Sequence, residues 1–166
     1  MNTETVGKIF LHELNAEVPA TRKCLKSIPE NLFGWKPHEK SMDMGYLALL
    51  VAAMPEWIVH TISDKVIDFA TYNPFRPKTT NELVKYFDEN ITDARNILEK
   101  VSDEEMKEMF FLKSSGQTLF SLPVDETVSS TLNHWVHHRG QLTVYMRLNN
   151  ILVPSIYGPS ADEKGF

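Results

Sequence analysis

The chain has 166 residues, of which 42% are hydrophobic and 23% are charged, and its net charge is −5. This length fits one domain, residues 1–166, with a single core, and the composition argues against a disordered chain. It also argues against a nucleic-acid partner, because phosphate contacts need a basic face and the sequence contains no cluster of Lys and Arg.

The sequence indicates a cytoplasmic protein. Its one cysteine, Cys24, cannot form an intramolecular disulfide, and the first ten residues lack the charged start and the long apolar run of a signal peptide. The richest apolar stretch, Tyr46–Met54, has about half of the roughly 20 residues that span a bilayer. We therefore expect neither secretion nor insertion into a membrane.

Apolar residues at helical spacing predict a first helix from Val6 to about Ile28, in which Pro19 should kink or locally break the helix. The prolines and the glycine of Pro29–Pro37 predict a connector. A second helix is expected from about Asp43 to Ser63, and Tyr72–Pro77 is a further helix breaker.

Two sequences of the form Ser/Thr-x-x-Glu have the pattern of a capping box. The first begins a predicted third helix over Thr79–Val101, and the second begins a short turn at Ser102–Glu105. The stretch Phe110–Leu122 mixes β-prone residues with Ser-Ser-Gly and predicts an excursion or a small hairpin. A fourth helix is expected over Asp125–Leu148, so the chain is predicted to be an all-α four-helix bundle.

The fourth helix carries the sequence His134-Trp-Val-His-His-Arg-Gly-Gln141. His134 and His138 are four residues apart, so their Cβ atoms lie about 5–6 Å apart on one helix face, and the pair can chelate one metal ion. His137 lies about 100° around the helix and is a poor third ligand. Such pairs also occur as hydrogen-bonded core residues, so the spacing leaves both interpretations open.

The longer sequence Asn133–Arg147 resembles the last bundle helix of the DinB/YfiT-like family, which carries a His-x-x-x-His-Arg-Gly-Gln pattern. The segments Ile28–Pro37 and Leu47–Trp57 resemble the family's first connector and second helix. The resemblance implies an up-down-down-up four-helix bundle, commonly a homodimer, with a divalent metal held by one histidine of the second helix and two of the last. Some relatives use such a metal to activate a low-molecular-weight thiol, acting as thiol S-transferases or as a thiol-dependent isomerase. For this chain the resemblance implies zinc or nickel.

The resemblance places the first metal histidine at Leu50, where the side chain cannot coordinate and is expected to face the core. Of the other histidines, His60 lies about 15 Å farther along the helix, His12 is expected to face solvent, and His38 lies in the connector. The resemblance therefore implies an incomplete metal site with His134 and His138 as its remaining ligands.

Glu17 is the best candidate for a substitute ligand. Its angular position falls within the apolar stripe of the first helix, where a buried carboxylate needs a partner. That partner could be a metal, a histidine of the fourth helix, or an arginine such as Arg139, although simple exposure of Glu17 is the favoured interpretation. Structural roles are expected for the remaining notable side chains, with Cys24 half-buried and the others packing or hydrogen-bonding: Met54, Trp57, Trp135, Arg139, Gln141 and Tyr145.

Two functions follow from these residues. The pair His134 and His138 suggests a metal-dependent enzyme of the thiol S-transferase type, whereas Leu50 suggests a non-catalytic dimeric bundle that has lost its metal and acts as a binding or scaffold protein. In a third possibility the histidines act as general bases or bind a ligand directly. The expected partners are a second copy of the chain and a small-molecule ligand or thiol, with no nucleic acid and no membrane.

Overall fold

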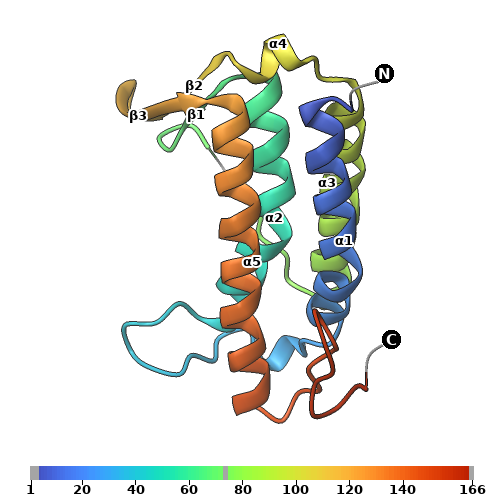
Figure 1. Cartoon of the computed structure of the whole chain (residues 1–166). Coiled ribbons are helices and arrows are strands. Elements are labelled where there is room, and N and C mark those ends of the chain that lie inside the picture. Colours follow the sequence, from blue (N-terminus) through green and yellow to red (C-terminus); the bar gives the residue numbers. More distant parts are fainter. Residues whose placement is uncertain (1–3, 73–74, 165–166) are drawn as a thin grey trace.

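The computed structural model describes residues 4–72 and 75–164. Four long helices lie side by side, and a small sheet with a short helix lies at one end of them (Figure 1). In chain order the elements are α1 (Val6–Lys26), the 3₁₀ turn η1 (Glu30–Leu32), α2 (Met44–Ser63), β1 (Val66–Asp68), α3 (Thr80–Lys100), α4 (Asp103–Met106), β2 (Met109–Ser114), β3 (Gln117–Pro123) and α5 (Val124–Leu148).

The four predicted long helices are confirmed, and the two predicted capping boxes are present at the starts of α3 and of the short helix α4. The Thr79 hydroxyl accepts the N–H of Glu82 at 3.1 Å, and the Glu82 carboxylate accepts the N–H of Thr79 at 3.3 Å. Ser102 and Glu105 form the same reciprocal box at the start of α4. The local break expected at Pro19 is wrong, because α1 runs unbroken past it. Positions 73–74 of the predicted breaker lie outside the described residues.

The long helices share one core. Helix α1 packs against α3 and α5, and α2 packs against the same two helices, so that α1 and α2 lie at opposite corners of the bundle. The core also receives Phe110 and Leu112 from β2. The α2 helix is more apolar than the sequence analysis expected: its 20 residues contain an 18-residue window with a mean hydropathy of 1.4, so the helix is long and apolar enough to cross a bilayer by composition alone. However, 61% of this window is buried inside the protein, which is typical of a core helix in a soluble bundle.

The sheet is an addition to the predicted all-α fold. The expected hairpin is present as β2 and β3, which pair antiparallel with an irregularity between Leu112 and Lys113. Strand β1 was not predicted, and it pairs with the other edge of β2 in parallel, giving the order β1-β2-β3. The carboxylate of Asp68 fixes the hairpin turn by accepting the N–H groups of Ser115 and Gly116.

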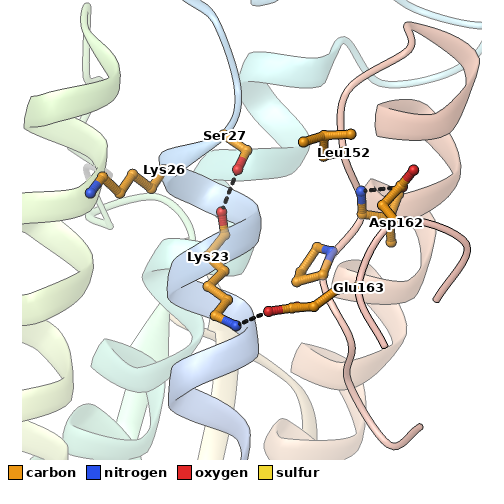
Figure 2. Close-up of a pocket in the computed structure, with 8 residues that line it drawn as sticks. Lys23, Lys26, Ser27, Leu152, Asp162 and Glu163 are labelled. Atoms are coloured by element: carbon orange, nitrogen blue, oxygen red, sulfur yellow. Dashed lines mark hydrogen bonds and ion pairs between the residues drawn. The ribbon is translucent and has the colours of Figure 1, made fainter. Parts of the chain in front are cut away.

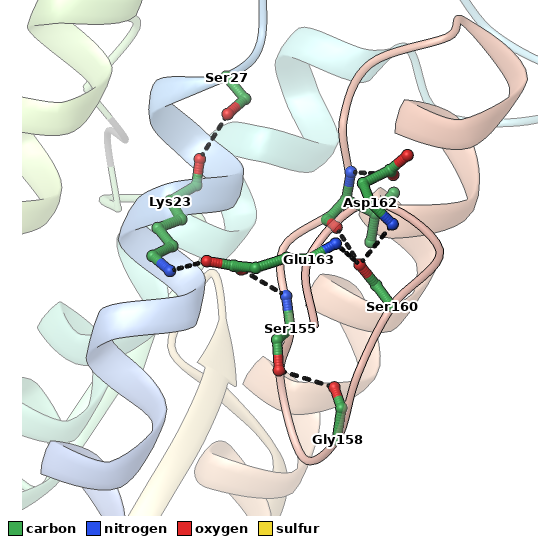
Figure 3. Close-up of polar contacts among 8 residues, drawn as sticks. Lys23, Ser27, Ser155, Gly158, Ser160, Asp162 and Glu163 are labelled. Carbon is green, nitrogen blue, oxygen red and sulfur yellow. Dashed lines mark hydrogen bonds and ion pairs between the residues drawn. The ribbon is translucent and has the colours of Figure 1, made fainter. Parts of the chain in front are cut away.

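The segment after α5 is irregular, but its own hydrogen bonds hold it against the bundle (Figure 3). The Asp162 carboxylate accepts the N–H of Val153 at 2.9 Å and also binds Arg147 of α5. Glu163 accepts the N–H of Ser155 and forms an ion pair with Lys23 of α1. These contacts tie the tail to two helices and bring Tyr157 to the junction of α1 and α5.

Candidate functional site

The structure places the two predicted metal ligands side by side on α5. The ring centroids of His134 and His138 are 4.4 Å apart, as expected from their spacing of four residues. His138 is buried, whereas His134 is exposed on the surface of the helix. His137 is also exposed, and its ring centroid lies 5.4 Å from that of His138.

His138 is held by a hydrogen bond within its own helix. Its Nδ1 lies 2.8 Å from Oε1 of Gln141, and an amide oxygen can only accept a hydrogen bond. This network assigns the proton to Nδ1 and leaves the lone pair of Nε2 available. A histidine that is oriented in this way by a second side chain is typical of metal sites, and it also suits a histidine that accepts a hydrogen bond from a ligand.

His134 favours its neutral form. Partial burial lowers the pKa of His134, and the neighbouring His138 and His137 lower it further. The ring is therefore uncharged at neutral pH, which is the form that can coordinate a metal or accept a proton.

A third ligand for the pair is missing. Leu50 of α2, which stands where the resemblance implies a histidine, is half-buried and carries no donor atom. Within residues 4–72 and 75–164 no three His, Cys, Asp or Glu side chains form a group that could hold a metal ion. Of the other histidines, His60 contacts Asp64 at 2.6 Å and His12 lies 3.6 Å from Glu4. The side chains present therefore do not fit a three-ligand metal centre.

Glu17, the candidate substitute ligand, forms an ion pair with an arginine instead. The prediction of simple exposure is wrong, because the residue is only 9% exposed and its Oε2 forms an ion pair of 2.5 Å with Nη1 of Arg139. The same guanidinium donates to the backbone oxygen of Glu17 and to the hydroxyl of Thr21. The arginine alternative of the sequence analysis is thus the one that the structure contains.

Tyr157 of the tail completes this cluster. Its hydroxyl donates to Oε1 of Glu17 at 3.0 Å and accepts from Nη2 of Arg139 at 2.9 Å. Burial and the Glu17 carboxylate raise the pKa of Tyr157, so that it stays protonated as a donor. Because Arg139 is itself only 2% exposed, Glu17 provides the negative charge that this buried guanidinium requires.

The remaining side chains have structural roles, as expected, but Cys24 is more deeply buried than predicted. Cys24 is fully rather than half-buried, and burial raises the pKa of its thiol to about 11. A thiol that remains protonated at neutral pH is a poor nucleophile. Tyr145 donates to the backbone oxygen of Met42 and packs edge-on against Trp35. Trp135 and Met54 are core residues.

A polar cluster that the sequence analysis missed lies at the end of α2. Oε2 of Glu56 accepts the hydroxyls of Tyr72 and Tyr86, both at 2.8 Å, and Nε1 of Trp57 donates to Tyr72. Glu56 and Tyr72, together with His60, line an open cavity of about 320 Å³. The only sequence signal for this cluster was the spacing of four between Glu56 and His60 on one helix face.

A second cavity of similar volume lies between the end of α1 and the tail (Figure 2). Lys23, Lys26 and Leu152 contribute to its walls, and the tail carboxylates Asp162 and Glu163 close one side. Lys23 and Glu163 are paired with each other across this cavity. Neither of these two cavities includes His134 or His138 among its lining residues.

The sequence model of the DinB family matches residues 1–164. The chain belongs to the DinB family. Crystal structures of two other members show the same fold. A DinB-like protein from Bacillus cereus ATCC 10987 is 21% identical with a TM-score of 0.69, over 90% of this chain and 97% of that one. The DinB-like protein YjoA from Bacillus subtilis is 17% identical with a TM-score of 0.70, over 94% and 99% of the two chains.

A curated relative matches the chain over a shorter region. The uncharacterized protein YrdA from Bacillus subtilis strain 168 is 43% identical over 42 residues, which is 25% of each chain. The match therefore spans a quarter of that relative, whose name states no activity.

Proposed function

We propose that this DinB-family protein is a non-catalytic, dimeric, cytoplasmic bundle of the up-down-down-up type, which lacks a three-ligand metal centre and acts as a binding or scaffold protein. The packing of α1 and α2 on the same two helices supports this helix order. The observation that carries the functional proposal is the ion pair of Glu17 with Arg139. With Leu50 unable to coordinate, Glu17 was the best substitute ligand, and recruiting it would leave a buried guanidinium without its counter-charge.

A specific observation favours a second candidate, a metal-dependent enzyme of the thiol S-transferase type. Gln141 holds His138 with Nε2 free, and His134 is adjacent in its neutral form. Two histidines and water can bind zinc or nickel, although catalytic zinc usually has three protein ligands. Such an ion would lower the pKa of a bound low-molecular-weight thiol. The side chains of this chain would supply only two of its ligands.

Metal content separates the two candidates. We would purify the protein without a histidine tag and measure zinc and nickel by plasma mass spectrometry, in parallel with Leu50→His and Leu50→Gln. We expect the unmodified protein and Leu50→Gln to hold far less than one equivalent and Leu50→His to approach one. Leu50→Gln is the matched control, since it places a polar side chain at the same position without an imidazole.

The opposite result has an equally definite meaning. Near-stoichiometric metal in the unmodified protein that disappears in His134→Ala/His138→Ala would show that a third ligand exists, and the enzyme candidate would replace the proposal. Thermal unfolding with added zinc gives a second readout, because a ligand at a hundred times its Kd stabilises the folded state by about 2.7 kcal/mol. We expect this stabilisation in Leu50→His alone.

A further inference from the structure

The β2–β3 hairpin has an apolar surface that the bundle does not cover. In Figure 1 the hairpin extends sideways from the end of the bundle, away from the long helices. Strand β3 carries no charged residue, and all of its residues up to the last are exposed. Five large side chains of the hairpin are between 37% and 54% exposed: Met109, Phe111, Leu119, Phe120 and Leu122.

Strand β3 is also an open edge of the sheet, because β2 is its one partner among the described strands. Natural edge strands are usually short, charged, interrupted or covered, since free N–H and C=O groups pair readily with another strand. The irregularity opposite Leu112 and Lys113 leaves Leu119 as an extra residue of β3, but the regular stretch from Phe120 to Leu122 is uncharged and uncovered. The edge therefore presents both hydrogen-bonding groups and apolar side chains to solvent.

The ladder identifies which backbone groups face outward. In an antiparallel pair, successive residues alternate between facing the neighbouring strand and facing away from it. Val124 donates to the backbone oxygen of Glu108 within the hairpin, whereas Phe111 donates to Lys65 on the β1 side of the sheet. Ser121 is the residue opposite Phe111. The N–H and C=O of Ser121 therefore point to the open edge.

We propose that β3 pairs antiparallel with β3 of a second copy about a two-fold axis at Ser121, joining two three-stranded sheets into one of six strands. This pairing places Phe120 of each copy opposite Leu122 of the other, within the regular part of the strand. Two equivalent apolar pairs then form on one face of the joined sheet. Pro123, which has no N–H to donate, lies at the end of the pairing, where a missing donor costs least.

The exposed area and the charge both suit a second copy as the partner. At about 200 Å² for a fully exposed large side chain, the five residues offer roughly 400 Å² of apolar surface per copy. That is close to the apolar share of a standard interface of about 800 Å² per partner. The chain has a net charge of −5, so two copies repel at long range, but the uncharged edge brings no like charges into contact.

The inference deepens the dimeric state proposed above and does not depend on the absence of metal. Analytical ultracentrifugation of the unmodified protein, Leu119→Lys, Ser121→Pro and Leu152→Lys over a dilution series tests it. Ser121→Pro removes an N–H that faces the open edge, and Leu152→Lys is the matched control at an exposed leucine of the tail. We expect a dimer for the unmodified protein and the control, and a dissociation constant about tenfold or more higher for the two edge variants.

Disulfide trapping tests the register separately and with folded protein. Oxidation of Ser121→Cys should yield a covalent dimer, because the two-fold axis places position 121 of one protomer next to position 121 of the other. Gln117→Cys is the control, since the same pairing places position 117 of one protomer roughly 27 Å from position 117 of the other. The native Cys24 is fully buried in the unmodified protein, so it should not form a competing disulfide.

An unmodified protein that stays monomeric at every concentration would overturn the inference, as would a dimer that Leu119→Lys and Ser121→Pro leave intact. The second result would show that another face forms the dimer and would leave the proposed function standing. Circular dichroism and thermal melting of each variant establish that a lost dimer is not a lost fold.

Discussion

At the residue scale, the partner of Glu17 decides how the α5 histidines are interpreted. A carboxylate on the apolar stripe of α1 needs a partner, and the fold provides Arg139 from α5 and Tyr157 from the tail. Glu17 and Arg139 are shielded from water, whereas Tyr157 is 69% exposed and reaches them with its hydroxyl. Their interdependence means that removing one charge should cost far more than removing both.

We expect a strong coupling between Glu17 and Arg139 in a double-mutant cycle. Glu17→Leu and Arg139→Met should each lower the free energy of unfolding by about 3–5 kcal/mol, because each leaves one buried charge unpaired. The double variant Glu17→Leu/Arg139→Met should lose much less than the sum of the single losses. Urea unfolding measures all of these values.

Tyr157→Phe is the comparison that removes no charge. We expect it to lower the free energy of unfolding by about 1–2 kcal/mol, through the loss of the two hydrogen bonds of the hydroxyl. Additive losses in the double variant would contradict a buried ion pair. They would instead make Glu17 available as a metal ligand after all.

At the scale of the elements, the closeness of two helices depends on a glycine. Gly7 lies in the first turn of α1, where an added Cβ would come within 2.5 Å of the backbone oxygen of Leu98 and 2.6 Å of Cγ1 of Val101. A backbone oxygen cannot move aside as a flexible side chain can. The approach of α1 to the end of α3 therefore requires the absence of a side chain at this position.

The same substitution at two helical glycines should have opposite effects. Gly7→Ala should lower the free energy of unfolding by about 1–3 kcal/mol through overpacking. Gly140→Ala in α5 has open space around the added carbon and should raise it by up to about 1 kcal/mol, because alanine favours the helix. Thermal and urea unfolding compare the pair. A Gly7→Ala protein as stable as the unmodified one would show that the ends of α1 and α3 lie farther apart.

The elements that were predictable from the sequence are those specified by nearby residues. The capping boxes at Thr79 and Ser102 locate two helix starts, and the spacing of His134 and His138 determines their shared face. Strand β1 was not predictable, because its three residues gain their strand character from parallel pairing with β2, more than forty positions later. The intrinsic β-propensity of three residues does not predict such a long-range pairing.

The candidate site likewise has one part that could be inferred from the sequence and another that depended on long-range contacts. The missing ligand at Leu50 could be inferred by resemblance, whereas the partner of Glu17 could not be chosen from the sequence. That choice depended on the helix phase beyond Pro19 and on an irregular tail that brings Tyr157 to α1. The Glu56 cluster was missed for a similar reason, since its two tyrosines come from different segments of the chain.

At the scale of the whole molecule, carboxylates near the surface tie separate segments together. Asp68 joins β1 to the hairpin turn, while Asp162 and Glu163 hold the tail to α5 and α1. The pKa of Asp68 is lowered by backbone N–H groups, that of Asp162 by its hydrogen bond with Arg147, and that of Glu163 by its hydrogen bond with Lys23. Each favours the folded state only while it is ionised.

These directions predict two separate pH windows for stability. The lowered pKa of His134 means that the unfolded chain binds this proton more readily, so stability should decrease slightly as the pH falls through the ordinary value of 6.5. The carboxylates, whose folded pKa values lie below the ordinary 3.8 for Asp and 4.5 for Glu, add stability above these values. That contribution should be lost as the pH falls through the lowered folded values.

The two windows can be assigned with two variants in thermal melts from about pH 7 down to about pH 3. His134→Gln should remove the small decrease in the upper window and leave the acid window unchanged. Asp162→Asn/Glu163→Gln should melt at a lower temperature than the unmodified protein at neutral pH and show a weaker dependence on acid. Identical acid profiles for this double variant and the unmodified protein would mean that the tail contributes nothing to stability, and that Tyr157 is held in place by Glu17 and Arg139 alone.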